Sequence, residues 1–398
     1  MAGKCQQAND TSECLSFDCL LMQLQVNTIR GSRVRFIASV IVSAFGLAAV
    51  WSPVVLHSQT ETLDIYIIDV EGGEATLFVS PSGESMLVDT GWPGFDGRDA
   101  DRIVEVARQA GIHQIDYLVV THFHRDHMGG ALQLAERLPI RHFVDRGAGT
   151  GLNDRGRMAF EAYAQLRSTG VHLKASPGDV VPISGLDVRI IAAGGAVLSA
   201  PLPGAGDPNA SCDSFTFHGD EVTNRAGDAE DRLSVSAVVS YGEFRTMIMG
   251  DLTWNKEYEL MCPDNTVGTV DAYLVSHHGA ETSGSEALVR AVEPRVAIMN
   301  NGPLKGGATQ TLQSLGALET LDDLWQNHYS VAGGEAYNSP ERFIANLEDG
   351  STDVRGAPGT LPVHMGVAHW IKVSAYSDGR FTVTNSRNGY SKSYADKN

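Results

Sequence analysis

One short segment constrains the fold of this chain more than any other feature, because it holds four potential metal ligands within six positions. They lie in the segment THFHRDHMGG (121–130) and are His122, His124, Asp126 and His127. The apolar run IDYLVVTH (115–122) predicts a buried strand before the cluster, and GGALQLAERLP (129–139) predicts a helix after it. Open α/β sheets place their sites at such strand ends, so the segment predicts a metal site.

Two more polar clusters end predicted strands. The hairpin LSVSAVVSYGEFRTMIMGDL (233–252) ends at Asp251, and VDAYLVSHHG (270–279) ends in His277 and His278. Because strand ends of one sheet lie together, we expect all three clusters to form one site.

The spacing also predicts how these groups share metal ions. Alternate residues of an extended turn point the same way, so His122 and His124 are expected to bind one ion. Asp126 and His127 are expected to face a second ion, and Asp251 to bridge the two. Imidazole and carboxylate ligands favour two zinc ions, with iron or manganese as alternatives. Such a pair generates hydroxide near neutral pH, which makes Asp126 and Asp251 the predicted catalytic residues.

Other apolar patterns predict a layered α/β domain over 58–398. Further strands are expected at 63–70, 83–91, 184–195 and 295–302, with a closing hairpin at 369–386. Further helices are expected at 100–111, 161–170, 285–294 and 311–328. Residues 200–231 form a long polar segment without periodicity, and a loop of that length is usually functional or mobile.

The pattern H-x-H-x-D-H-x-G-G between strand and helix resembles the metallo-β-lactamase superfamily. LVDTG (87–91), GDL (250–252) and SHHG (276–279) follow in the order that family shows. The resemblance spans about 63–302 and is strongest to the soluble metallo-hydrolase domain of bacterial DNA-uptake channel proteins. It implies a four-layer αββα sandwich with a dinuclear metal site on one edge.

The resemblance also implies individual roles. One histidine of the 277–278 pair would complete the second metal position, and Asp89 would orient a ligand histidine. Many family members carry another histidine before the strand that leads to the bridging aspartate. Here that place reads GDAEDRLSV (227–235), so either Asp231 substitutes or the first ion is held more loosely.

The N-terminus predicts export. Arg30, Arg33 and Arg35 precede an apolar run, Phe36 to Trp51, which predicts a secretory signal or an uncleaved membrane anchor. Together with the N-terminal extension before it, this segment is expected to span residues 1–57. The location is then periplasmic or extracellular. After that segment only Cys212 and Cys262 remain, and an oxidising compartment makes a disulfide between them plausible.

The reaction stays open at this point. The net charge of −18 argues against an extended nucleic-acid surface. Lys305 in the glycine-rich segment NNGPLKGG (300–307) could hold a phosphate oxygen, with Asn301 as a second substrate contact. A phosphodiester substrate is therefore the first hypothesis. The alternatives are a small-molecule amide or ester hydrolase, including a β-lactamase, and a metal-binding protein without turnover.

Overall fold

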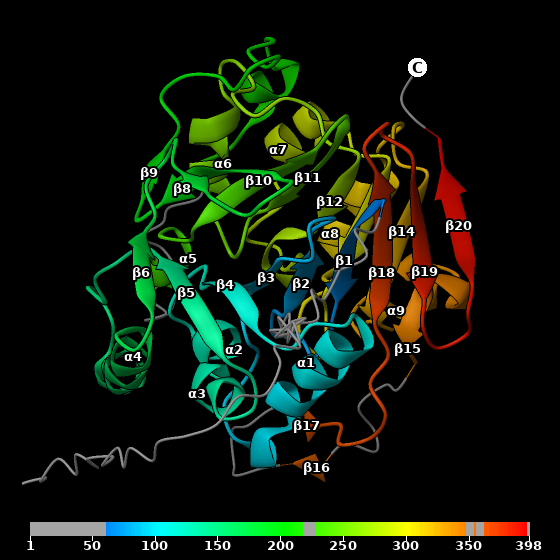
Figure 1. Cartoon of the computed structure of the whole chain (residues 1–398). Helices are drawn as coiled ribbons and strands as arrows, with labels where there is room; N and C mark the ends of the chain where they lie inside the picture. The colour runs from blue at the N-terminus through cyan, green and yellow to red at the C-terminus, as the bar shows by residue number, and fades with distance from the viewer. Residues whose placement is uncertain (1–60, 218–227, 348–353, 356–361, 396–398) are drawn as a thin grey trace, which may run out of the picture. The chain divides into compact units, whose positions relative to one another are not determined.

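The computed structural model of this 398-residue chain describes residues 61–217, 228–347, 354–355 and 362–395 (Figure 1). These residues belong to one compact unit, Leu56–Asn398. The predicted extension and signal or anchor at 1–57 lies outside the described residues. Within the described ranges, no helix combines the length and the apolar character needed to cross a membrane.

The first sheet has nine strands in the order β20-β19-β18-β1-β2-β3-β4-β5-β6. Its strands are β1 Thr62–Ile67, β2 Thr76–Val79, β3 Ser85–Val88, β4 Ile115–Val119, β5 Ile140–Asp145, β6 Val171–Lys174, β18 Ile371–Tyr376, β19 Phe381–Asn385 and β20 Ser391–Tyr394. Neighbours from β20 to β3 pair antiparallel, and those from β3 to β6 pair parallel.

The second sheet follows the order β15-β14-β13-β12-β11-β10-β8-β7, with β9 paired to β8. Its strands are β7 Val180–Val181, β8 Asp187–Ala193, β9 Ala196–Val197, β10 Ser236–Tyr241, β11 Phe244–Ile248, β12 Ala272–Leu274, β13 Val296–Met299, β14 Asp323–His328 and β15 Ile344–Asn346. The strands from β11 to β15 are parallel, so their carboxyl ends share one edge.

Three apolar cores hold four layers together. One core joins the facing surfaces of the two sheets and includes Ile65, Phe78 and Val239. A second lies between the first sheet and helices α1 Arg98–Gln109, α3 Ala131–Ala135 and α4 Asp154–Arg167. A third lies between the second sheet and helices α6 Trp254–Met261, α7 Glu286–Val292 and α8 Thr309–Gly316 (Figure 1). The predicted αββα sandwich is confirmed.

One element was predicted wrongly. The range 311–328 was expected to be a single helix, but α8 ends at Gly316 and β14 occupies 323–328. β14 pairs parallel with β13 and with β15, which buries its polar residues. Gln326, Asn327 and His328 each find hydrogen-bond partners in the interior. Their polarity hid the strand, because a buried strand normally reads as an apolar run.

Two more differences concern short segments. β2 lies between the predicted strands 63–70 and 83–91 and was not expected, although all four of its residues are buried. The long segment 200–231 contains a short 3₁₀ helix, η2 Ala210–Ser214, and one turn of helix, α5 Asp228–Asp231. Residues 218–227 of that segment lie outside the described part. A disulfide joins Cys212 in η2 to Cys262 at the end of α6.

Candidate metal centre

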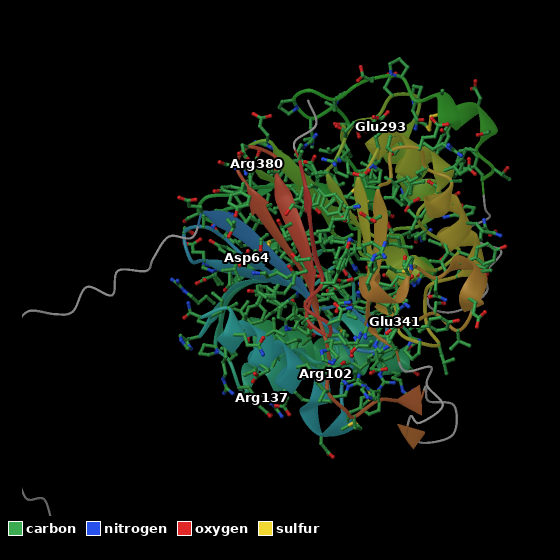
Figure 2. All side chains as sticks on the ribbon, turned by 90° about the vertical axis from the view of Figure 1, so that its right-hand side faces the viewer. Asp64, Arg102, Arg137, Glu293, Glu341 and Arg380 are labelled. Carbon is green, nitrogen blue, oxygen red and sulfur yellow. A yellow bond between two sulfur atoms is a disulfide. The ribbon has the colours of Figure 1, made fainter. Side chains whose placement is uncertain are left out.

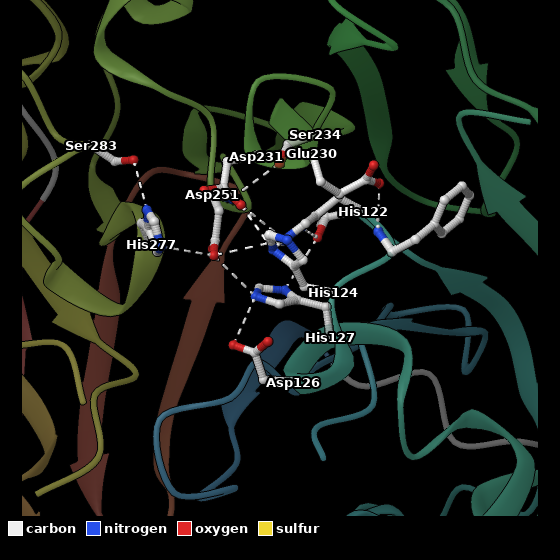
Figure 3. Close-up of polar contacts among 12 residues, drawn as sticks. His122, His124, Asp126, His127, Glu230, Asp231, Ser234, Asp251, His277 and Ser283 are labelled. Atoms are coloured by element: carbon white, nitrogen blue, oxygen red, sulfur yellow. Dashed lines mark hydrogen bonds and ion pairs between the residues drawn. The ribbon is translucent and has the colours of Figure 1, made fainter. Parts of the chain in front are cut away.

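The three predicted polar clusters meet where strands of both sheets end (Figure 3). The 121–128 segment follows β4 of the first sheet, whereas Asp251 follows β11 and the 277–278 pair follows β12 of the second. Asp231 joins them from α5, just before β10. Two groups of side chains result, each with its ligand-type atoms within 4.8 Å of one another.

The first group contains His122, His124, Asp231 and Asp251. His122 Nε2 and His124 Nδ1 are 2.8 Å apart, and Asp231 Oδ1 lies 2.9 Å from His124 Nδ1. Asp231 therefore lies within reach of both imidazoles of the first group. The first group has two imidazoles and two carboxylates, all buried except the partly exposed His124.

The second group contains Asp126, His127, His278 and Asp251. His127 Nε2 lies 3.2 Å from His278 Nε2, 3.5 Å from Asp126 Oδ2 and 3.3 Å from Asp251 Oδ2. All four residues are buried. Asp251 belongs to both groups, which is the position expected of a bridging ligand.

His277 belongs to neither group. Its Nε2 lies 3.2 Å from Asp251 Oδ2, and its Nδ1 is within 3.0 Å of Thr282 Oγ1 and 3.3 Å of Ser283 Oγ (Figure 3). Both His277 and His278 have positive φ angles, 52° and 55°. Non-glycine residues rarely adopt this conformation, and strain of this kind is typical of functional sites. The turn separates the two rings and sends only His278 into the second group.

The charge balance fits cations. Burial opposes ionisation of Asp251, but the imidazoles of His127, His277 and His278 hold the pKa of its carboxyl well below the usual range. Burial also opposes protonation of His127, yet three neighbouring carboxylates, with Asp251 foremost, raise the pKa of its imidazole well above the usual value. Asp251 Oδ1 is buried and accepts no hydrogen bond. A buried carboxylate oxygen without a hydrogen bond, surrounded by imidazole nitrogens, is the kind of ligand set that binds a divalent ion.

Asp89 lies behind the second group, at the end of β3. Its Oδ2 is 2.7 Å from His127 Nδ1 and accepts a 2.6 Å hydrogen bond from the Thr121 hydroxyl. Its Oδ1 accepts a hydrogen bond from Thr121 N at 2.8 Å. A carboxylate fixed in this way sets the tautomer of His127 and points Nε2 towards the second group.

A buried ion pair supports the first group from behind. Glu230 Oε1 accepts a 2.9 Å hydrogen bond from the backbone N–H of Phe123, which stands between His122 and His124. Arg146 donates to both carboxylate oxygens of Glu230, at 2.8 and 2.6 Å, and stacks over the Phe123 ring. The pair thus ties α5, which carries Asp231, to the His-x-His segment. No local sequence pattern signalled it, because its partners lie 84 residues apart.

The two predicted substrate contacts have different environments. Lys305 Nζ donates to Asp126 Oδ2 and to Gly72 O, and its side chain is 26% exposed. It therefore stands at the rim of the second group. Asn301 is fully buried and its amide donates to Gly302 O and His328 O, at 3.0 and 2.8 Å. The Asn301 side chain connects the ends of β13 and β14, and it is not exposed to a substrate. The geometry therefore does not support a substrate contact by Asn301.

Sequence reasoning missed a third group, which contains Asp69, Glu71 and His364. Arg102 of α1, labelled in Figure 2, donates to Asp69 Oδ2 at 3.0 Å and to Glu71 Oε1 at 3.4 Å. His328 Nε2 lies 2.7 Å from Asp69 Oδ1. Arg102 and His328 thus balance the negative charge of Asp69 and Glu71 without a metal ion. We therefore interpret the third group as a buried ion-pair network. The segment DVEGG (69–73), which places two carboxylates just after β1, is the sequence feature that could have indicated this group.

Sequence comparisons with known proteins support the family resemblance. The profile of the Metallo-beta-lactamase superfamily matches residues 68–299. Recombination protein 2 of Haemophilus influenzae is 24% identical over 264 residues, 65% of this chain and 27% of that protein. The chain thus spans about a quarter of that relative's length, and the match is consistent with the narrower resemblance noted above.

The solved structures that match this chain do so with low sequence identity and low TM-scores. The metallo-beta-lactamase fold protein YhfI from Bacillus subtilis is 11% identical, with a TM-score of 0.41 over 67% of this chain and 96% of that one. A diphosphatase from the PhnP family is 10% identical, with a TM-score of 0.32 over 60% of this chain and 87% of that one. The family profile covers more than half of the chain, and on that basis the chain belongs to the metallo-beta-lactamase superfamily, whose members are metal-dependent hydrolases.

Proposed function

We propose that this chain is an exported hydrolase of phosphodiester bonds with two divalent ions, most simply zinc. One observation carries the choice of bond: the Lys305 ammonium stands at the rim of the second group, beside Asp126. A fixed cation there attracts an anionic substrate such as a phosphodiester and offers less to an uncharged amide or ester.

The loop that carries Lys305 is held in place by close backbone packing. A Cβ on Gly72, whose φ is +72°, would lie 2.9 Å from Gly302 N and 3.0 Å from the Lys305 Cβ. Gly72 O also accepts a hydrogen bond of 2.6 Å from Lys305 Nζ. The ammonium is thus positioned before substrate arrives, which limits the reorganisation that phosphate binding requires.

Each group of side chains then has one task. His122, His124 and Asp231 would hold the first ion, Asp126, His127 and His278 the second, and Asp251 both. Two ions bound in this way supply Lewis acidity and a water molecule activated near neutral pH. Asp89 keeps His127 in one orientation, and Lys305 binds a non-bridging phosphate oxygen. The disulfide between Cys212 and Cys262 supports the exported location, because disulfides persist in oxidising compartments.

A screen with three chromogenic substrates tests this function. Purified protein with added zinc, iron or manganese would be assayed with bis(p-nitrophenyl) phosphate, nitrocefin and p-nitrophenyl acetate. We expect turnover of the phosphodiester, and a lower kcat/KM for it in Lys305→Met. Preferential turnover of nitrocefin or of the acetate would instead assign a β-lactamase or an esterase. A metal-loaded protein inactive on all three would contradict the proposal.

A further inference from the structure

A cleft of about 770 Å³ lies next to His277, separated from the two metal groups by that side chain. Its walls come from the η2 segment 211–216, from Trp254, from the segment 281–287 and from α8. Two wall residues, Thr282 and Ser283, contact His277 Nδ1 at 3.0 and 3.3 Å, and His277 Nε2 reaches Asp251. Ser283 in the cleft wall is thus one side chain, His277, away from the proposed bridging ligand Asp251 (Figure 3).

Residues with hydroxyl groups make up about half of the cleft wall. Eight of its fifteen lining residues are serine or threonine, and within the described residues the hydroxyls of Ser211, Thr216 and Ser314 make no hydrogen bond to the protein. Within the described part of the chain, no hydrogen bond engages the side chains of Gln310 and Ser314. Hydroxyl and amide groups both donate and accept hydrogen bonds, so they match a ligand whose own groups do both.

Two aromatic rings add an apolar surface to these polar groups. Phe215 and Trp254 both line the cleft, and Phe215 is supported from behind by Tyr258, with ring centroids 4.6 Å apart. Rings of this kind pack against the C–H face of a ligand while the surrounding hydroxyls bind its polar edge. A volume of this size lies in the range of small-molecule sites.

The charge of the cleft excludes a second anion. Among the described residues that line it, none is lysine, arginine or histidine, whereas Glu281 and Glu286 are both present. Glu286 is already paired with Arg290 at 3.2 Å, so Glu281 is the principal charge. A chain of phosphates would be repelled here. This lining suits a group that has no negative charge, several hydrogen-bonding groups and an apolar face.

From these features we infer that the cleft binds a sugar ring attached to the scissile phosphate. This inference rests on the proposed function, because it assigns the cleft to a part of the same substrate. It restricts that substrate to a small phosphodiester with one phosphate at the metal centre and a sugar in the cleft, either a nucleoside or a hexose. The disulfide between Cys212 and Cys262 would fix the η2 wall against α6.

A comparison of substrates with one leaving group tests the sugar. The p-nitrophenyl esters of uridine 5′-monophosphate and of glucose 6-phosphate would be compared with bis(p-nitrophenyl) phosphate. We expect Gln310→Leu to lower kcat/KM for one sugar ester, relative to bis(p-nitrophenyl) phosphate, by about tenfold, the effect of one lost hydrogen bond. The sugar ester that responds identifies the nucleoside or the hexose.

A matched control lies on the same helix. Gln313 is also an exposed glutamine of α8 but does not line the cleft, so Gln313→Leu should leave all three activities unchanged. An equal effect of both variants, or an unchanged substrate ratio in Gln310→Leu, would overturn the inference. Preferential hydrolysis of p-nitrophenyl phosphorylcholine, lost in Glu281→Gln, would also overturn it by assigning the cleft to a cation.

Binding without turnover separates this inference from the proposed function. Saturation-transfer NMR on the full chain would measure contact with methyl glucoside and with uridine, neither of which carries a phosphate. A signal that Gln310→Leu removes and Gln313→Leu keeps supports the cleft assignment even if no phosphodiester is hydrolysed. Hydrolysis of bis(p-nitrophenyl) phosphate without any sugar signal supports the proposed function and overturns the subsite.

Discussion

Asp251 is the residue on which both metal groups depend. It is shared by the two groups, and its Oδ1 lacks a hydrogen bond. Asp126 belongs to the second group alone and already pairs with Lys305. The two aspartates therefore have different contacts in the same centre, and we expect different consequences when each is replaced.

We predict that Asp251→Asn abolishes turnover and lowers the metal content of both positions. The reason is that two nearby cations would lose the negative charge that they share. Asp126→Asn should lose mainly one ion. Metal analysis of gently purified protein measures both outcomes and should find close to two ions per wild-type chain. Normal activity of Asp251→Asn would rule out a bridging role.

Asp231 gives a second prediction at this scale. In the proposed ligand set, Asp231 supplies a negative charge where the resembling family carries a neutral imidazole. Asp231→His should make the first position more electrophilic, so the acidic limb of the pH–rate profile should move to lower pH while activity is kept. Asp231→Asn, which removes the charge without a ring, is the matched control and should shift the limb in the same direction. An unchanged pH–rate profile with unchanged metal content would show that Asp231 is not a ligand of the first ion.

At the scale of elements, α6 and the start of α7 are joined by one buried carboxylate. Glu257 accepts hydrogen bonds from Gly284 N and Ser285 N, both at 2.7 Å, and its side chain has no exposed surface. Burial raises the pKa of Glu257 to about 7, against 4.5 ordinarily, although the backbone donors oppose the shift. The native state therefore holds a proton here that the unfolded chain releases.

This shift predicts a pH dependence of stability. Between about pH 4.5 and 7 the native state binds more protons than the unfolded state, so the contribution of Glu257 to the free energy of unfolding falls as pH rises. The full difference is on the order of 3 kcal/mol. Denaturant unfolding at pH 5 and pH 8 should show a smaller loss in Glu257→Gln than in wild type. Equal losses in the two proteins would refute the assignment.

Elements also show what the sequence can and cannot predict. The strands before the metal centre were predictable because each is a continuous apolar run that ends abruptly in polar ligand-type residues. β14 was not, because its polarity is satisfied by partners far away in the chain, such as the pair of His328 with Asp69. The same holds for Glu230 and Arg146: the residues that bind metal cluster locally, whereas those that position them come from distant elements.

At the scale of the whole molecule, the metal centre lies between two sheets that also share an apolar core and polar contacts such as those of His328 with Asp69 and of Trp325 with Tyr394. His122, His124, Asp126 and His127 follow a strand of the first sheet, and Asp251 and His278 follow strands of the second. Ions that bind groups from both sheets would connect the halves of the sandwich. A ligand that binds only the native state raises its stability by mass action.

Metal removal should therefore lower the stability of the entire domain rather than of one loop. With free metal at about 1,000 times its Kd, the loss on chelation is about 4 kcal/mol. The midpoint of thermal unfolding, measured with and without a chelator, should fall in one cooperative transition that both near-UV and far-UV circular dichroism follow. Asp251→Asn should show a much smaller fall, because its native state binds metal weakly and has less to lose. If chelation left the wild-type midpoint unchanged, or shifted only a minor separate transition, the ions would not connect the two sheets.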